Sequence, residues 1–297
     1  MGRAETHARL SARLAALDDA TLEQAVNVPS TTTGIGGAVS TVDIDGTRVF
    51  VKRIPLTARE AAEPMSTVNL FGLPAYCHYG VSSPGFGAWR ELAAQQLTSA
   101  WVLSGICPRF PLLYHWRVLP RPAPSALTGT EAQDVERQFL AWGQLQPIRE
   151  RFTERYLATS SIVLFLEYIP HVLRSWLAAR HDALAMVERE LIEVTSVMRA
   201  RGLVHFDMHF ENVLTDGEHL FVSDFGQASS DAFELSPDER AQLASHADFD
   251  LDCAMRSLAN LVSDPAIRER YGARASVMNA FFTELRHGSK TTPYPGP

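Results

Sequence analysis

The chain has 297 residues, of which 46% are hydrophobic, and it carries a formal net charge of −7. This composition is typical of a globular protein with a sizeable core and excludes a chain that is disordered throughout. Mild acidity without a block of Lys or Arg also argues against a nucleic-acid binder, because such proteins usually show a clustered basic footprint.

Cysteine usage and hydropathy indicate where the protein works. The three cysteines (Cys77, Cys107 and Cys253) form no CxxC pair, so we expect neither a disulfide framework nor a thiolate metal site. The N-terminus lacks the apolar run of a signal peptide, and the longest apolar stretch, residues 161–170, is too short to span a bilayer. We therefore expect a cytoplasmic protein that does not engage a membrane.

The first half of the chain predicts a β-rich fold with one embedded helix. Between Val28 and Leu56, a Ser/Thr/Gly stretch precedes an alternating apolar pattern with an Asp-Gly turn, which is typical of a hairpin headed by a glycine loop. In chain order, we expect a leading helix over residues 5–26, the hairpin over 28–56, an irregular insertion over 57–87, a helix over 88–104 and a strand over 110–119.

The second half predicts mainly helices. Its clearest signal is one apolar face from Leu184 to Met198, which indicates a long helix that Gly202 ends. In chain order, we expect a helix over residues 131–156, a buried strand over 161–169, the long helix, two short strands about the Asp216-Gly217 turn, helices over 248–262 and 265–285, and a disordered tail.

The segment HFDMHFENVL, residues 205–214, carries the strongest chemical signal. Asp207 lies five residues before Asn212, and Asp224 stands twelve residues further on, in SDFG. Phosphoryl transfer from ATP needs carboxylate and amide ligands for Mg²⁺ and a carboxylate that orients the acceptor hydroxyl. The combination resembles the protein kinase superfamily, whose catalytic loop reads HxDxxxxN and whose metal-binding motif is DFG.

The resemblance implies a role for each matching residue. Asp207 would be the catalytic base or hydroxyl-orienting residue, and Asn212 and Asp224 would hold Mg²⁺. Gly226 would permit the turn behind Asp224, and His205 would hold the loop in place. The implied cofactors are ATP and Mg²⁺.

Lys52 matches the phosphate-binding lysine of the family. Apart from Lys290 in the tail, it is the chain's one lysine among many arginines, and it lies on the strand that follows the glycine loop. Gly34, Gly36 and Gly37 resemble the glycine-rich loop, in which absent side chains let backbone N–H groups approach phosphate oxygens. A plain turn remains the alternative for these glycines.

Two further contacts follow from the resemblance. A helix carboxylate commonly steers the phosphate-binding lysine, and Glu91 is the first candidate, with Glu60 and Glu63 as alternatives. Backbone groups of Glu167 and Ile169, at the end of the buried strand, would bind the adenine. One of the helix aspartates in HADFDLDCA, residues 246–254, would brace the catalytic loop, with Asp248 and Asp250 as the candidates.

The acceptor stays open between a protein Ser/Thr and a small molecule. His209 stands where Ser/Thr protein kinases carry lysine and where aminoglycoside- and choline-type kinases carry histidine, and it would line the acceptor side of the catalytic site. No APE motif follows Gly226, and the chain beyond it is short, which also favours a small molecule. The intact DFG favours a protein. Phe206 replaces the arginine of HRD, so control by activation-loop phosphorylation is not expected.

Three other interpretations of the motif compete with this one. His205, Asp207 and His209 could ligate a metal, although no HExxH or cysteine partner supports zinc. Two structural histidines without chemistry would leave the spacing of Asp207, Asn212 and Asp224 unexplained. A pseudokinase, which binds nucleotide without turnover, usually lacks at least one of the residues present here.

The expected fold class is therefore α+β, a bilobal protein-kinase-like fold with a β-rich N-terminal lobe and a short, mainly helical C-terminal lobe. The expected activity is Mg·ATP-dependent transfer of the γ-phosphate to a hydroxyl group. The expected regions are a helical extension (1–26), an ATP-binding lobe with insertions at 57–87 and 120–160 (27–169), a lobe with the catalytic loop and DFG (170–286) and the tail (287–297).

Overall fold

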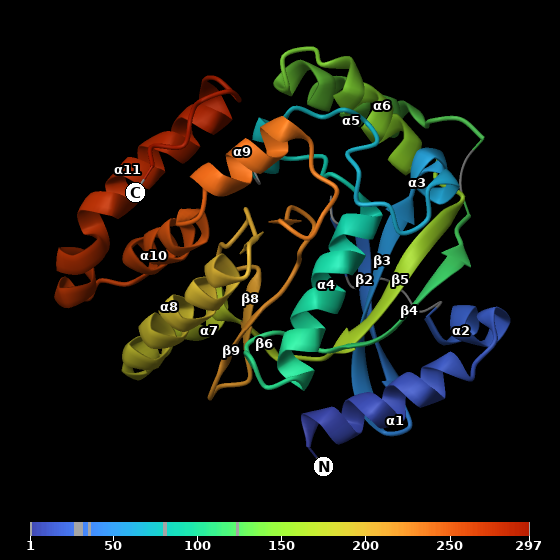
Figure 1. Ribbon diagram of the computed structural model, residues 1–297, viewed down its shortest axis with the longest axis horizontal. Coiled ribbons are helices and arrows are strands. Elements are labelled where there is room, and N and C mark those ends of the chain that lie inside the picture. The colour runs from blue at the N-terminus through green and yellow to red at the C-terminus, as the bar shows by residue number, and fades with distance from the viewer. Residues whose placement is uncertain (1, 27–31, 35–36, 80–81, 123–124, 297) are drawn as a thin grey trace.

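The computed structural model describes residues 2–26, 32–34, 37–79, 82–122 and 125–296 and shows a mixed α and β fold (Figure 1). Its main sheet is antiparallel, with strand order β1-β2-β3-β5-β4. The strands are β1 (Thr32–Gly34), β2 (Gly37–Ile44), β3 (Thr47–Leu56), β4 (Leu113–Pro120) and β5 (Ser160–Glu167).

The β2–β3 hairpin confirms the predicted Asp-Gly turn. Asp45 and Gly46 both have positive φ, at 49° and 75°, which is what a two-residue turn of the type found in hairpins requires. The turn fixes the register of β3, so that Lys52 pairs with Val39 on β2 and with Leu164 on β5. Lys52 thus lies on an inner strand of the sheet.

Helices cover both faces of this sheet (Figure 1). The helices α1 (Arg3–Ala15) and α2 (Asp19–Val26) pack through Leu14 and Leu22 against Val49, Val51 and Phe165 on one face. On the other face, α4 (Ala88–Leu103) packs through Trp89 and Leu92 against Ile54 and Leu164. Because side chains alternate along a strand, Lys52 shares a face with Ile54 and therefore points toward α4.

The predicted leading helix is divided in two. The helix α1 ends at Ala15, and α2 begins at Asp19 after the side chain of Asp18 accepts a hydrogen bond from the Thr21 amide at 2.7 Å. Such a bond caps a helix N-terminus and favours a new start at this point. Both helices belong to the same core cluster as the sheet.

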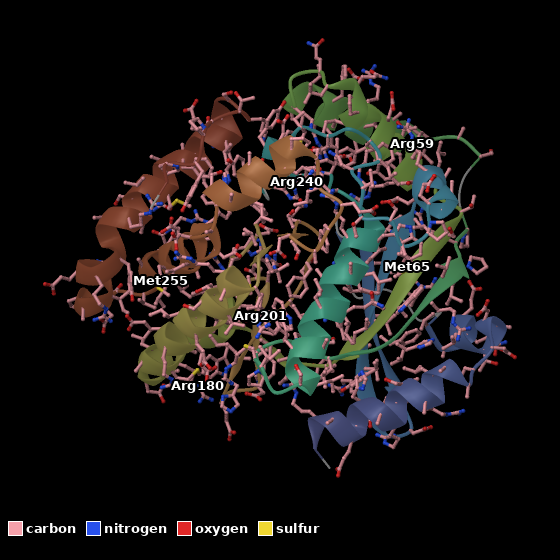
Figure 2. The ribbon with its side chains drawn as sticks, viewed as in Figure 1. Arg59, Met65, Arg180, Arg201, Arg240 and Met255 are labelled. Carbon is pink, nitrogen blue, oxygen red and sulfur yellow. The ribbon has the colours of Figure 1, made fainter. Side chains whose placement is uncertain are left out.

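The two predicted insertions pack against each other. The first contains α3 (Ala58–Ala62) and a 3₁₀ turn (Ala75–His78), and the second contains α5 (Gly129–Ala141) and α6 (Gln146–Tyr156). Phe71 and Phe86 from the first segment join Trp142, Ile148 and Phe152 in one cluster. Arg59 of α3, which is labelled in Figure 2, also forms ion pairs with Glu150 and Glu154 of α6.

The helix predicted over residues 131–156 is likewise two helices. The chain reverses after α5 at Gly143 and Gln144, which have φ values of 70° and 62°. A left-handed residue, usually glycine, is a common helix C-terminus, and the proline at the N-terminal turn of α6 favours a fresh start. The result is a helical hairpin instead of one long helix.

The rest of the chain is mainly helical and gathers beside the sheet (Figure 1). Short strand pairs join its helices, with β6-β8-β9 forming one small sheet and β7-β10 another. The elements are β6 (His171–Val172), α7 (Leu173–Leu177), a 3₁₀ turn (His181–Ala183), α8 (Leu184–Ala200), β7 (Leu203–Val204), β8 (Val213–Thr215), β9 (Leu220–Val222), β10 (Ser229–Ser230), α9 (Pro237–Ser245), α10 (Phe249–Leu261) and α11 (Pro265–His287).

The C-terminal tail differs from the disordered segment that was expected. Tyr294 stacks on His246 with ring centroids 4.8 Å apart and contacts Phe249 edge-on at 5.2 Å. Its hydroxyl donates to Asp252. The buried aromatic cluster offers the tail a docking surface that local composition does not reveal.

Among the helices of the described residues, none combines the length and the hydropathy that a membrane span requires.

Candidate active site

Lys52 lies at the centre of a buried group of charges. Its Nζ is 2.6 Å from Glu91 Oε1 and 2.8 Å from Asp224 Oδ1. The side chains of Lys52 and Glu91 are each 6% exposed, whereas Asp224 is 43% exposed. Strand β3, helix α4 and the segment after β9 thus each supply one member. Of the three candidate carboxylates for Lys52, the structure places Glu91 in contact.

The pKa values of these three groups reflect two opposing effects, namely burial, which disfavours a charge, and the opposite charges beside each group, which favour it. Burial alone would lower the pKa of Lys52, but the carboxylates of Asp224 and Glu91 outweigh it and raise the pKa. Burial raises the pKa of Glu91, and Lys52 offsets part of that shift. For Asp224, burial would raise the pKa, but the charge and hydrogen bond of Lys52, with smaller effects from His205 and the Gly226 amide, together lower it. Lys52 is therefore a fixed cation held between two carboxyl groups.

The start of α4 is held by the first insertion. Glu60 Oε1 accepts a hydrogen bond from the Ala88 amide at 2.8 Å, and the Glu60 carbonyl accepts one from Trp89 Nε1 at 2.7 Å. Arg151 of α6 pairs with the same carboxylate at 3.1 Å. Glu60, an alternative partner for Lys52 by sequence, therefore orients the helix that carries Glu91, and Glu63 is exposed.

A second buried ion pair fixes α4 from the other side. Arg90 Nη1 donates to Glu239 Oε1 of α9 at 2.6 Å, and both side chains are 2% exposed. Arg90 Nε also donates to the Thr67 carbonyl at 2.6 Å. Because Arg90 adjoins Glu91, these contacts limit how far α4 can rotate away from Lys52. The position of Glu91 is thus set by contacts from three segments.

Asp207 and Asn212 face each other across the predicted catalytic loop. Asn212 Nδ2 donates to the Asp207 carbonyl at 3.0 Å and to Asp207 Oδ2 at 3.1 Å. Burial raises the pKa of Asp207 to about 6, although His209 and Asn212 lower it. The preceding residue, Phe206, has a positive φ of 62°, a strained conformation that persists only where surrounding contacts enforce it.

His205 joins this loop to the segment that carries Asp224. Its Nε2 lies 2.9 Å from the Ser223 carbonyl, and its Nδ1 accepts from the Asp207 amide at 3.2 Å. A carbonyl only accepts, so Nε2 carries the proton and the ring is neutral. Burial lowers the pKa of His205 to about 4, consistent with that state. Both ring nitrogens are occupied, which leaves His205 unable to ligate a metal.

Asp250 braces the same loop from α10. Its Oδ2 accepts from the His205 amide at 2.7 Å, and its Oδ1 accepts from the Phe206 amide at 3.0 Å. These two bonds enforce the strained backbone before Asp207. Burial raises the pKa of Asp250 to about 7 against the effect of these donors. Asp248, the other sequence candidate, instead pairs with Arg199.

Asp224 and Gly226 show why glycine stands in SDFG. Asp224 has a positive φ of 63°, and its Oδ1 accepts from the Gly226 amide at 3.4 Å. A Cβ at Gly226 would lie 3.3 Å from Asp224 Oδ1 and 3.3 Å from Glu91 Oε2. A side chain at this position would therefore crowd two carboxylates, whereas the φ of Gly226 is not among the positive ones.

His209 lies at the edge of the loop. Its Nε2 is 3.5 Å from Asp207 Oδ1, its Nδ1 accepts from the Glu211 amide at 3.2 Å, and its side chain is 41% exposed. Within the part of the chain that the structure describes, no group of three or more His, Cys, Asp or Glu side chains could hold a metal. The interpretation of the motif as a histidine metal site is therefore not supported.

The predicted nucleotide contacts are only partly described. Gly34 and Gly37 pair at the tip of the β1–β2 hairpin, and Gly36 lies outside the described residues. The Glu167 amide donates to the Leu112 carbonyl at 2.8 Å, so that N–H is not available to an adenine. The Glu167 side chain binds Arg3 of α1 at 2.6 Å. Ile169 follows β5 in a segment without regular structure.

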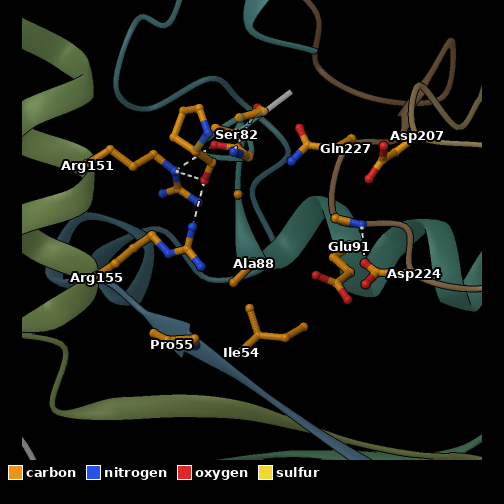
Figure 3. Close-up of a pocket in the computed structure, with 15 residues that line it drawn as sticks. Ile54, Pro55, Ser82, Ala88, Glu91, Arg151, Arg155, Asp207, Asp224 and Gln227 are labelled. Atoms are coloured by element: carbon orange, nitrogen blue, oxygen red, sulfur yellow. Dashed lines mark hydrogen bonds between the residues drawn. The ribbon is translucent and has the colours of Figure 1, made fainter. Parts of the chain in front are cut away.

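A cavity of about 210 Å³ opens beside these residues (Figure 3). Glu91, Asp207 and Asp224 lie on one side of it, and Arg151 and Arg155 reach in from α6 on the other. The cavity therefore has three carboxyl groups facing two guanidinium groups. The sequence does not predict these two arginines as site residues, because they lie in an insertion whose packing no motif specifies.

Both arginines are held in place by the loop before α4. Arg151 Nε donates to the Gly85 carbonyl at 2.7 Å, and Arg155 Nη1 donates to the Pro84 carbonyl at 2.9 Å. Burial lowers the pKa of Arg155 to about 10, which still leaves it charged at neutral pH. The two cations offset part of the negative charge across the cavity.

Comparison with known proteins adds little to this geometry. No protein-family model and no curated protein matches the sequence. Among solved structures, the chain is similar to WaaP in complex with acyl carrier protein, with 13% identity, coverage of 90% of this chain and 87% of that chain, and a TM-score of 0.43. That likeness says nothing about substrate or activity, so the site is interpreted from its own residues.

Proposed function

We propose that this protein is an ATP- and Mg²⁺-dependent phosphotransferase of protein-kinase-like fold that transfers the γ-phosphate to a hydroxyl group. The observation that carries the proposal is Lys52 Nζ, 2.6 Å from Glu91 and 2.8 Å from Asp224, with Asp207 lining the same cavity. A fixed cation between carboxylates, beside a carboxyl that can orient a hydroxyl, supplies what phosphoryl transfer requires.

The residues present fit a magnesium ion. Carboxylate and amide oxygens are suitable Mg²⁺ ligands, and Asp224 is the exposed carboxylate of the group. Asn212 uses its Nδ2 to bind Asp207, so its Oδ1 is the atom left to ligate. Asp224 and Asn212 would hold the ion, which would supply charge neutralisation on the phosphates. Lys52 would bind the α- and β-phosphates.

Asp207 would act on the acceptor. The acceptor oxygen would form a new bond to the γ-phosphorus while the bond from that phosphorus to the bridging oxygen of ADP breaks. The hydroxyl proton would pass to the Asp207 carboxylate, which must be ionised to accept it. Its hydrogen bond from Asn212 fixes the carboxylate orientation, which favours in-line attack.

The acceptor surroundings favour a small molecule over a protein. A second cavity, of about 270 Å³, begins at Asp207 and is bounded by Phe206, Cys253 and Phe282. Small ligands bind in such concave sites, whereas an extended peptide needs an open groove. A protein Ser/Thr acceptor remains the alternative, supported by the intact DFG sequence.

A binding experiment tests the nucleotide part of the proposal. Calorimetric titration of ATP with and without Mg²⁺ should show saturable binding that Mg²⁺ strengthens, and Asp224→Asn should remove the effect of the metal. The exposed Asp238→Asn, which makes the same charge change, should bind like the wild type. Metal-independent binding that is equal in all three proteins would refute the assigned Mg²⁺ site.

A further inference from the structure

The 270 Å³ cavity beside Asp207 contains more positive than negative charge. Arg256 of α10 and Arg286 of α11 line it, whereas Asp207 is the one carboxyl group among its described lining residues. Asp207 also lines the 210 Å³ cavity that holds Glu91 and Asp224, so it stands between the two spaces. A molecule in the 270 Å³ cavity would therefore reach Asp207 without entering the cavity that Glu91 and Asp224 line.

Neither arginine has a carboxylate partner among the described residues. Arg256 Nε is buried without a hydrogen-bond partner, and Nη1 makes one long bond of 3.4 Å to Asn279 Oδ1. Burial lowers the pKa of Arg256, and repulsion from Arg286 lowers it further. Arg286 is exposed, but the half-buried guanidinium of Arg256 has an unsatisfied donor, and an oxyanion ligand would satisfy this donor and attract both cations.

An adjoining cavity of about 430 Å³ shares Arg256, Arg286 and His209 with the first. Its other charges, Arg174 and Glu211, already pair with each other at 3.3 Å. The excess positive charge thus continues along the same surface, away from Asp207. A cationic acceptor would meet repulsion here, whereas an anionic one would be attracted.

We propose that the acceptor is a small hydroxyl compound that carries an oxyanion, a phosphate or a carboxylate, and that Arg256 and Arg286 bind this group while the hydroxyl faces Asp207. The inference rests on the proposed phosphotransferase function and specifies its substrate class. Arg256 is oriented for the task, because its guanidinium stacks over the Phe282 ring at 4.3 Å from the ring centroid. Planar guanidinium groups suit bidentate binding of phosphate or carboxylate.

The anion site is tested by binding alone. Inorganic phosphate and acetate are titrated into the full chain with saturating Mg²⁺ and a non-hydrolysable ATP analogue, so that the nucleotide site is occupied. We expect saturable binding of at least one anion to the wild type and a rise in Kd of roughly tenfold in Arg286→Gln, as loss of one charge-assisted bond would cause.

Two further variants complete that test. Arg286 is exposed, so Arg286→Gln should fold, and Arg268→Gln makes the same change on an exposed part of α11 outside both cavities. Arg256→Lys keeps the charge but removes the planar guanidinium that can donate two parallel hydrogen bonds, so it should also weaken anion binding. The inference is overturned if neither anion binds the wild type, or if Arg286→Gln and Arg268→Gln bind equally well.

A transfer assay tests the substrate class. Cell extract is separated by ion exchange into anionic, neutral and cationic metabolites and protein, and each fraction receives the enzyme with γ-labelled ATP. Label is expected in the anionic fraction, and label confined to any other fraction would overturn the inference. The proposed function fails in a different way: label in no fraction would contradict phosphoryl transfer itself, whereas label in a fraction other than the anionic one would contradict only the substrate class.

Discussion

At the scale of single residues, the proposed role of Asp207 depends on its protonation state. Burial raises its pKa to about 6, well above the ordinary value of 3.8. Only the ionised carboxylate can accept a proton from the acceptor hydroxyl. If Asp207 accepts the proton as proposed, turnover should have a lower pH limit that an aspartate of ordinary pKa would not impose.

This raised pKa predicts the pH dependence of turnover. The kcat/KM for the acceptor should fall as the pH decreases, with a midpoint near 6 that reports the Asp207 carboxyl before the acceptor binds. A pH–rate profile from pH 4.5 to pH 8 at saturating Mg·ATP measures it. A profile that stays flat down to pH 4.5 would show that no carboxyl group with a raised pKa takes part in turnover.

The same shift predicts a change in stability. A carboxyl whose pKa is raised on folding contributes stability that is fully present below the unfolded pKa and is lost as the pH rises through about 6. Above that pH the buried charge is unfavourable, so Asp207→Asn should have a higher Tm than the wild type at pH 8 without metal. A lower Tm for this variant at pH 8 would contradict the assigned shift.

The sequence predicted site residues where chemistry fixes their spacing. Asp207, Asn212 and Asp224 lie within eighteen positions, and phosphoryl transfer needs an amide and two carboxylates close together. Arg151 and Arg155 could not be predicted, because their role depends on how α6 packs against the loop before α4. That packing comes from long-range contacts that have no local periodicity.

At the scale of elements, α4 is the helix whose placement matters most. The Glu60 carboxylate accepts a hydrogen bond from the Ala88 amide and forms an ion pair with Arg151, and the residue is 1% exposed. Burial would raise the pKa of Glu60, but Arg151 and the backbone donors lower it. The first insertion therefore presents a buried carboxylate to the start of the helix that carries Glu91.

Removal of the Glu60 carboxylate should lower both the stability of the fold and the affinity for Mg·ATP. Glu60→Gln leaves Arg151 buried without its ionic partner, which should cost about 3–5 kcal/mol in the free energy of unfolding. Because α4 carries Glu91, affinity for Mg·ATP should also fall. Urea unfolding and calorimetry measure the two effects. Glu63→Gln, three residues away and exposed, is the matched control, and an equal loss in both variants would refute the role of Glu60.

Element types were largely predictable, and their ends were not. The helix over residues 88–104 is confirmed as α4, and the strand that starts at residue 161 as β5. The prediction of one helix over residues 131–156 was wrong, because the apolar spacing continues across the break between α5 and α6. Gly143 and Pro147 are nevertheless the signals of a helix end and a new start. Periodicity alone cannot separate two helices in register.

At the scale of the whole molecule, segments distant in sequence share one core. Trp101 of α4 belongs to the same hydrophobic cluster as Leu191 of α8, Phe249 of α10 and Phe282 of α11. Arg3 near the N-terminus binds Glu167 at the end of β5. The mixed α and β composition was predictable from the sequence, but these contacts were not, because no local pattern encodes which surfaces meet.

The docked tail predicts a measurable contribution to stability. Tyr294 contacts the rings of His246, Phe249 and Phe281. Loss of these contacts in Tyr294→Ala should lower the free energy of unfolding by about 1–3 kcal/mol. Thermal unfolding compared with the exposed Thr291→Ala measures it. No difference between the two variants would mean that the tail does not stabilise the fold in solution.

Phosphoryl transfer itself is tested by following the γ-phosphate of labelled ATP in the presence of Mg²⁺ and cell extract. We expect the wild type to transfer label to an acceptor, and Asp207→Asn to lower kcat by about 10²–10⁴-fold while it still binds Mg·ATP. Wild-type protein that binds Mg·ATP without transferring label, or equal transfer by both proteins, would contradict it.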